Sequence, residues 1–106
     1  MKETLQELVN KFNENADVNK KLKDIDRMIT IKFSDDGTYH IHLKDGKLSD
    51  VEEGEVESQI AVEMTSEVFN GILNKEIDAL TAYLTKKISI NASLMDKLLI
   101  KDLFKG

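Results

Sequence analysis

Apolar residues recur at helical spacing in the first part of the chain. The first stripe, at i, i+3, i+4 and i+7, consists of Leu5, Leu8, Val9 and Phe12. Thr4 and Glu7 form a T-x-x-E capping box, which predicts that the helix begins there. Asp17 is the expected cap of a second, shorter helix, whose stripe is Val18, Leu22 and Ile25.

The pattern then changes to strict alternation of apolar and polar residues, which is typical of strands with one buried face. Alternating segments at 27–34, 38–44 and 47–51 predict an antiparallel meander, with Asp36-Gly37 and Asp45-Gly46 as its turns. The expected inward residues are Ile29, Ile31, Phe33, Tyr39, Ile41 and Leu43. The acidic segment 52–58 contains glycine and is predicted to be a loop.

A fourth strand is predicted at 59–64, followed by a helix that Thr65 or Ser66 caps and Asn74 ends. The expected inward residues are Ile60, Val62 and Met64 on the strand and Val68, Phe69, Ile72 and Leu73 on the helix. This order of elements predicts an α+β protein with helices gathered on one face of the sheet. The length of 106 residues suits a single domain over residues 1–106.

The segment 75–104 is expected to form a helix, a short strand and a last helix capped by Ser93. Ile77, Leu80, Tyr83 and Leu84 give the first helix an apolar face, and Ile88 and Ile90 share one face of the strand. The apolar arc of the last helix contains Leu94, Met95, Leu98, Leu99 and Leu103. This arc of about 180° exceeds the usual stripe of about 100°. Such a helix either packs against two neighbours or a second copy of the chain, or lines a cavity for an apolar ligand.

Composition excludes several classes of function. The net charge of −5 argues against nucleic acid as a partner. The chain has no cysteine and no apolar run of the roughly 20 residues that a spanning helix needs, so we expect no stable membrane insertion. The charged start MKETLQE does not resemble a signal peptide, and the simplest expectation is a soluble, cytoplasmic protein.

The residues give little indication of catalysis or of a metal centre. His40 and His42 share one face of a strand, and Glu63 or Asp50 could complete a metal site only if their strands were adjacent to it. The simpler interpretation, that the two histidines belong to a solvated polar face, is favoured. No metal or other cofactor is expected. No nucleophile elbow, P-loop or dinucleotide fingerprint is present, so we do not expect an enzyme.

The last half of the chain resembles the sterol carrier protein family. Gln59–Phe69 (QIAVEMTSEVF) is similar to the family's alternating strand, Met-Ser/Thr-x-Glu and helix. Lys75–Tyr83 (KEIDALTAY) resembles its Gly-x-Leu/Ile-Asp-Pro-x-x-Ala-Phe signature, and Lys86–Met95 (KKISINASLM) resembles its Gly-Lys-Leu-Lys-Ile-x-Gly-Asp-x-Met segment.

The chain departs from the family pattern at five positions. Gln59 replaces an aspartate, Ala79 replaces a proline, and Lys75, Lys86 and Ala92 replace glycines. If those glycines serve turns with positive φ, each replacement costs about 1 kcal/mol or requires another turn geometry.

The resemblance implies a five-stranded, mostly antiparallel sheet with helices on one face and an apolar tunnel under the C-terminal helix. It implies binding of a fatty acid, acyl thioester or other lipid. The candidate lining residues are Phe33, Ile41, Val62, Phe69, Leu80, Tyr83, Leu84, Leu94, Met95, Leu98 and Leu99, and the head-group candidates are Lys97, Lys101 and Asp102. About half of these apolar residues are expected to be ordinary core.

Two other functions remain open at this stage. The same fold with a filled core would serve as a protein-interaction or oligomerisation module, for example as a homodimer formed through the last helix. It could also be an accessory domain of an acyl-metabolising enzyme.

Overall fold

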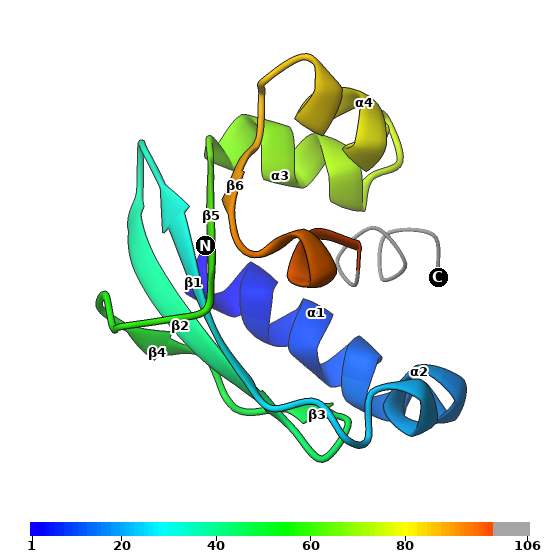
Figure 1. The fold of residues 1–106 in the computed structure, drawn as a ribbon. Coiled ribbons are helices and arrows are strands. Elements are labelled where there is room, and N and C mark those ends of the chain that lie inside the picture. The colour runs from blue at the N-terminus through cyan, green and yellow to red at the C-terminus, as the bar shows by residue number, and fades with distance from the viewer. Residues whose placement is uncertain (99–106) are drawn as a thin grey trace.

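The computed structural model describes residues 1–98 and has the architecture shown in Figure 1. Its elements are α1 (Lys2–Glu14), α2 (Ala16–Lys21), β1 (Arg27–Phe33), β2 (Gly37–Lys44), β3 (Lys47–Leu48), β4 (Glu52–Glu53), β5 (Ile60–Met64), α3 (Ser66–Leu73), α4 (Ala79–Leu84) and β6 (Ser89–Asn91). A further helix begins at Leu94 and is described as far as Leu98. Among the helices of this part of the chain, none has the length and apolar character needed to cross a membrane.

The strands form one mixed sheet, and the α+β fold predicted from the sequence is confirmed. The order across the sheet is β3-β2-β1-β5-β6, and β4 also pairs with β2. β1 and β5 are parallel, with Ile29 opposite Ile60 and Phe33 opposite Met64, whereas the other pairs are antiparallel. A connection between parallel strands needs a long crossover, which segment 34–59 supplies by way of β2, β3 and β4.

The sheet has six strands instead of the five expected, because the third predicted strand is interrupted. The segment predicted as a strand at 47–51 pairs only at Lys47–Leu48, and pairing resumes at Glu52–Glu53, inside the predicted loop. Between them Val51 turns into the core, where its backbone N–H donates to Gln6 Oε1 at 3.0 Å. Burial of Val51 therefore breaks the edge strand into β3 and β4.

The first helix begins earlier than the capping box predicted. Met1 is the N-cap of α1, and its ammonium group forms an ion pair with Asp36 at 2.9 Å. Thr4 lies inside the first turn and does not cap the helix, so that prediction is wrong. Leu5 and Val9 are fully buried, as the apolar stripe predicted.

The core lies between the sheet and the helices on one of its faces (Figure 1). Phe33 is at its centre, with its ring edge-on to Tyr39 at 6.1 Å and to Phe69 at 5.3 Å between centroids. The buried cluster consists of Leu5, Val9, Phe33, Tyr39, Ile41, Val51, Met64, Phe69, Ala82 and Ile88. The inward orientation predicted for Phe33, Ile41 and Phe69 is confirmed.

Candidate functional site

Helix α4 is positioned by its first residue and by its one buried side chain. Asp78 is the N-cap, and its carboxylate accepts hydrogen bonds from the Thr81 N–H (2.9 Å) and hydroxyl (2.8 Å). Ala82 packs into the core, while Leu80 is exposed and Leu84 is 69% exposed. The prediction that Leu80 and Leu84 face inward is therefore wrong. A helix of six residues offers the core less than two turns, and here the small Ala82 takes the inward position.

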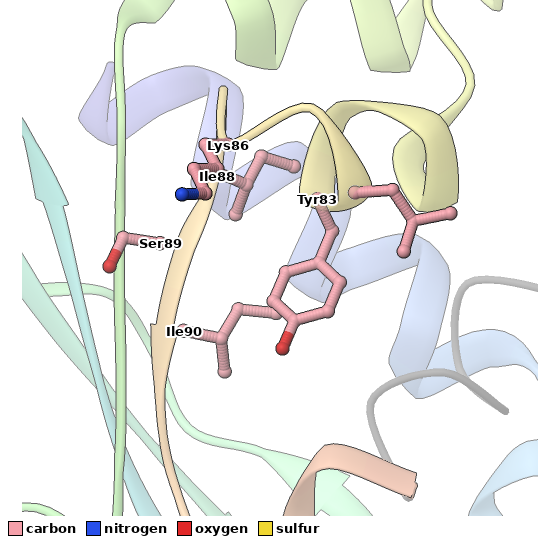
Figure 2. A pocket seen from close by; sticks show the side chains of 6 residues that line it. Tyr83, Lys86, Ile88, Ser89 and Ile90 are labelled. Atoms are coloured by element: carbon pink, nitrogen blue, oxygen red, sulfur yellow. The ribbon is translucent and has the colours of Figure 1, made fainter.

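An open pocket of about 420 Å³ lies where α4 meets β6. Its wall consists of Tyr83, Leu84, Lys86, Ile88, Ser89 and Ile90. Figure 2 shows the Tyr83 ring extending from α4 toward Ile90 on β6. Ile88 is buried at the base, because β6 pairs with β5 and alternation turns Ile88 and Ile90 to the helix side of the sheet. The volume is within the range of small-molecule sites, roughly 300 to 1,000 Å³.

The turns after α3 and α4 place lysines in the left-handed backbone region. Lys75 has φ +62° and Lys86 has φ +64°. After α4, the Lys86 N–H donates to the Tyr83 carbonyl (3.1 Å) and the Lys87 N–H donates to the Ala82 carbonyl (2.8 Å). This is the Schellman pattern, in which glycine is the usual residue at the left-handed position. Of the three glycine replacements, Lys75 and Lys86 therefore keep the glycine-type turn with its strain, whereas Ala92 does not have a positive φ.

The helix that begins at Leu94 is held to the sheet by an ion pair. Ser93 caps it, accepting from the Asp96 N–H at 3.2 Å, which confirms the predicted cap. Asp96 is only 5% exposed, and its carboxylate accepts from Arg27 Nε at 2.9 Å. Arg27 is the first residue of β1 and the only arginine of the chain. The pair therefore connects the start of the last helix to the central strand of the sheet.

The apolar residues of this helix do not lie where the sequence placed them. Leu94 is 74% exposed, Met95 is 75% exposed and Leu98 is also exposed, so the prediction that they face inward is wrong. Asp96 holds the inward position instead. Their role in ligand binding stays a prediction.

The other predicted site residues fall into three groups. Phe33, Ile41 and Phe69 belong to the buried core, and Val62 is half-buried against it. Tyr83 and Leu84 line the pocket, and Lys97 is half-buried. Three further candidates, Leu99, Lys101 and Asp102, lie outside the described residues.

Four pocket residues were not among the predicted ones: Lys86, Ile88, Ser89 and Ile90. The alternation of Ile88 and Ile90 was visible in the sequence and indicated a buried face. What it did not indicate is that this face stays partly uncovered beside α4.

The two histidines are engaged separately. His40 Nδ1 lies 3.0 Å from the Gly54 carbonyl, and His42 Nε2 is hydrogen-bonded to the Asp26 carboxylate. Glu63 is on β5, and β1 lies between that strand and β2, which carries both histidines. The topology thus separates Glu63 from them. Within residues 1–98 no three metal-ligating side chains gather in a group that could hold an ion.

The cap of α4 is a carboxylate, so its contribution to stability depends on pH. Hydrogen bonds from Thr81 hold the pKa of Asp78 below its usual value of 3.8. Because the pKa is depressed on folding, this stabilisation is present above pH 3.8 and is lost as pH falls through the folded-state pKa. We expect Asp78→Asn, which can cap at every pH, to lose less thermal stability than the parent between pH 5 and pH 2. Equal decreases in the melting temperatures of the two proteins between pH 5 and pH 2 would contradict the role of the Asp78 carboxylate.

These features define a small α+β domain that offers an apolar pocket between a short helix and the last strand of a mixed sheet. The model of the SCP-2 sterol transfer family matches residues 5–105. The chain belongs to this family, as its resemblance predicted, and membership indicates lipid binding or transfer.

Solved structures show the same fold at low identity. A crystal structure of sterol carrier protein 2 superposes with a TM-score of 0.67 at 16% identity, covering 92% of this chain and 87% of that one. Palmitated SCP2L2 from Aedes aegypti gives 0.64 at 11% identity, covering 96% and 95%. The sec-alkylsulfatase Pisa1 from Pseudomonas sp. gives 0.71 at 15% identity over 95% of this chain, which spans only 15% of that enzyme. A search of curated proteins found no match.

Proposed function

We propose that this chain binds or transfers a fatty acid, an acyl thioester or a similar lipid without catalysing a reaction on it, and that residues 1–106 form one such domain. The observation that carries the proposal is the pocket of about 420 Å³ between α4 and β6. Four of its six lining residues, Tyr83, Leu84, Ile88 and Ile90, offer apolar surface to an acyl chain.

The energetics support a ligand of this kind. Burial of each methylene contributes about 0.8 kcal/mol, so ten buried methylenes contribute about 8 kcal/mol before the costs of ordering. Loss of translational and rotational freedom on association offsets at least about 4 kcal/mol of this gain, so the remainder and the head-group contacts set the affinity. The palmitated neighbour from Aedes aegypti shows that the same fold carries a sixteen-carbon acyl chain in another protein.

The polar groups of the pocket favour binding over catalysis. They are the Lys86 ammonium, the Ser89 hydroxyl and the Tyr83 phenol. A serine nucleophile needs a base within hydrogen-bonding distance, and both histidines of the chain are on β2, on partners of their own. We therefore assign the Lys86 ammonium and the Tyr83 phenol to orientation of a ligand, since Ser89, between Ile88 and Ile90, extends to the other side of β6 (Figure 2).

Native mass spectrometry of the freshly purified protein, before and after organic extraction, tests the proposal first. We expect a lipid-sized additional mass that extraction removes, and uptake of palmitate by the extracted protein. A clean monomer mass with no uptake of palmitate would contradict the carrier function.

Leu84→Glu gives a sharper test of the pocket itself. Leu84 is 69% exposed, so the substitution leaves the core intact, but it removes apolar surface from the pocket and adds a negative charge. We expect the dissociation constant for palmitate to rise about tenfold, which corresponds to roughly 1.4 kcal/mol. Isothermal titration with the extracted protein measures it.

Leu73→Glu is the matched control. Leu73 is an exposed leucine on α3 that does not line this pocket. The control should bind palmitate as the parent does. Equal weakening by both variants would mean that added negative charge, and not the pocket, governs the affinity.

The exposed leucines of the last helix favour a second candidate, an interaction surface. Leu94 and Met95 are each about three-quarters exposed, and large exposed apolar patches mark sites of association. A dimer mass in the same native spectrum, with no bound lipid, would favour a homodimer through this helix. A role as an accessory domain of an acyl-metabolising enzyme is the third alternative, because a region of this fold makes up 15% of the alkylsulfatase chain.

A further inference from the structure

Lys86 combines two features that no other residue of the described chain combines. It has a left-handed backbone at φ +64°, which favours glycine, and its side chain lines the pocket. Lys75 has almost the same φ, +62°, and the same place in a Schellman turn, with its N–H donating to the Ile72 carbonyl at 3.1 Å. Lys75 does not line the pocket, so the two lysines differ in their surroundings and not in their backbone.

The surroundings of Lys86 leave its positive charge for a ligand. The other lining residues are Tyr83, Leu84, Ile88, Ser89 and Ile90, and none carries a carboxylate. The ion pairs found within residues 1–98 join Met1 to Asp36, Arg27 to Asp96 and His42 to Asp26, and Lys86 is in none of them. In Figure 2 Lys86 lies near Ile88, at one end of the apolar wall that Tyr83 and Ile90 continue.

A positive group at one end of an apolar wall suits an amphiphile with an anionic head. The chain as a whole has a net charge of −5 and repels anions at long range, so an anionic ligand gains from a local cation. Two backbone hydrogen bonds, from Lys86 and Lys87 to the end of α4, fix the point from which the side chain extends.

We propose that Lys86 binds the carboxylate of a fatty acid and makes the site prefer ionised fatty acids over uncharged lipids of the same chain length. This inference rests on the proposed function, since it assigns the head-group contact within that pocket. It also gives the strained turn a role, because glycine would relieve the strain and remove the cation.

The test compares palmitate with hexadecanol, which has the same carbon number and no charge. We expect Lys86→Gly to raise the dissociation constant for palmitate about three- to fivefold, the upper part of the range for a solvated ion pair. The dissociation constant for hexadecanol should change less than about twofold, because an uncharged head group loses only a weak hydrogen bond. Fluorescence displacement at neutral pH measures both.

Lys75→Gly is the control, and it separates binding from backbone strain. Both glycine variants relieve a left-handed lysine, so both should melt roughly 4 °C above the parent. Only Lys86→Gly should lose palmitate affinity. A variant that is more stable and yet binds palmitate less well cannot be explained by misfolding.

Each remaining outcome is decisive. The head-group assignment is overturned if Lys86→Gly binds palmitate as tightly as the parent does. It is also overturned if Lys86→Gly loses affinity for hexadecanol and palmitate by the same factor. In both cases the carrier function stands. If the parent binds hexadecanol but not palmitate, the assignment is again overturned. If the parent binds neither lipid, the proposed function and the inference both fail.

Discussion

Gly46→Ala is expected to lower the free energy of unfolding by about 3 kcal/mol, since two costs add at this residue. Gly46 has φ +79°, where a side chain is strained. An added Cβ would also lie 2.0 Å from the carbonyl oxygen of Asn19 and 2.9 Å from its carbon. Both atoms are backbone, so relief of the clash requires α2 to move away from the β2–β3 turn. Urea unfolding followed by circular dichroism measures the change.

Gly54→Ala is the matched control for the first cost alone. Gly54 has φ +108°, but a Cβ there would meet no atom within 4 Å. We expect this variant to lose about 1 kcal/mol, the cost of a left-handed residue without a clash. Equal losses at Gly46 and Gly54 would show that α2 yields without cost, and would contradict the argument from close packing.

The turn at Gly46 was predictable from the local sequence, but its packing against α2 was not. The Asp45-Gly46 pair was predicted as a hairpin turn, because such residues accept positive φ, and Asp45 and Gly46 have φ +54° and +79°. The close approach of Asn19 was not predictable. It depends on how α2 packs against the turn, and no periodicity in the sequence reports the distance between two separate elements.

The strands were predicted better than the helices for a similar reason. Alternation in a strand fixes which residues share a face, so Tyr39, Ile41 and Leu43 were placed correctly in the core. A helix of six residues has too few apolar positions for its period to identify the buried face. In α4 the leucines suggested an inward face, but the core accepts Ala82, and Leu80 and Leu84 remain exposed.

The candidate site was predictable only in outline. The resemblance to the family directed attention to α4, β6 and the last helix, and Tyr83 and Leu84 do line the pocket. The contribution of Lys86 was not predicted, because the family pattern has glycine there and offers no side chain to consider. Burial of Asp96 was not predicted either, because its partner Arg27 is 69 residues away in the chain.

Arg27→Met is expected to destabilise the protein by about 2 kcal/mol and to release the start of the last helix. The substitution leaves the Asp96 carboxylate, which is 5% exposed, without the cation that offsets its burial. The helix can regain hydration for this carboxylate only by moving away from β1. Chemical denaturation gives the loss of stability, and hydrogen exchange of the amides of residues 94–98 should accelerate relative to those of β1.

Arg27→Met combined with Asp96→Leu distinguishes the ion pair from the bulk of its side chains. If the buried charge is what costs stability in the single variant, removing both charges should restore most of it, since apolar replacement of a buried pair is often neutral. A double variant as unstable as Arg27→Met would instead assign the loss to the contacts of the arginine itself, including its hydrogen bond to the Asp26 carbonyl at 2.8 Å.

Palmitate exchange rates of the two variants then show whether the Arg27–Asp96 pair controls ligand release. Faster palmitate exchange in the single variant alone would show that the Arg27–Asp96 pair slows ligand release by holding the last helix. Equal exchange rates in both variants would show that this ion pair does not control access to the pocket.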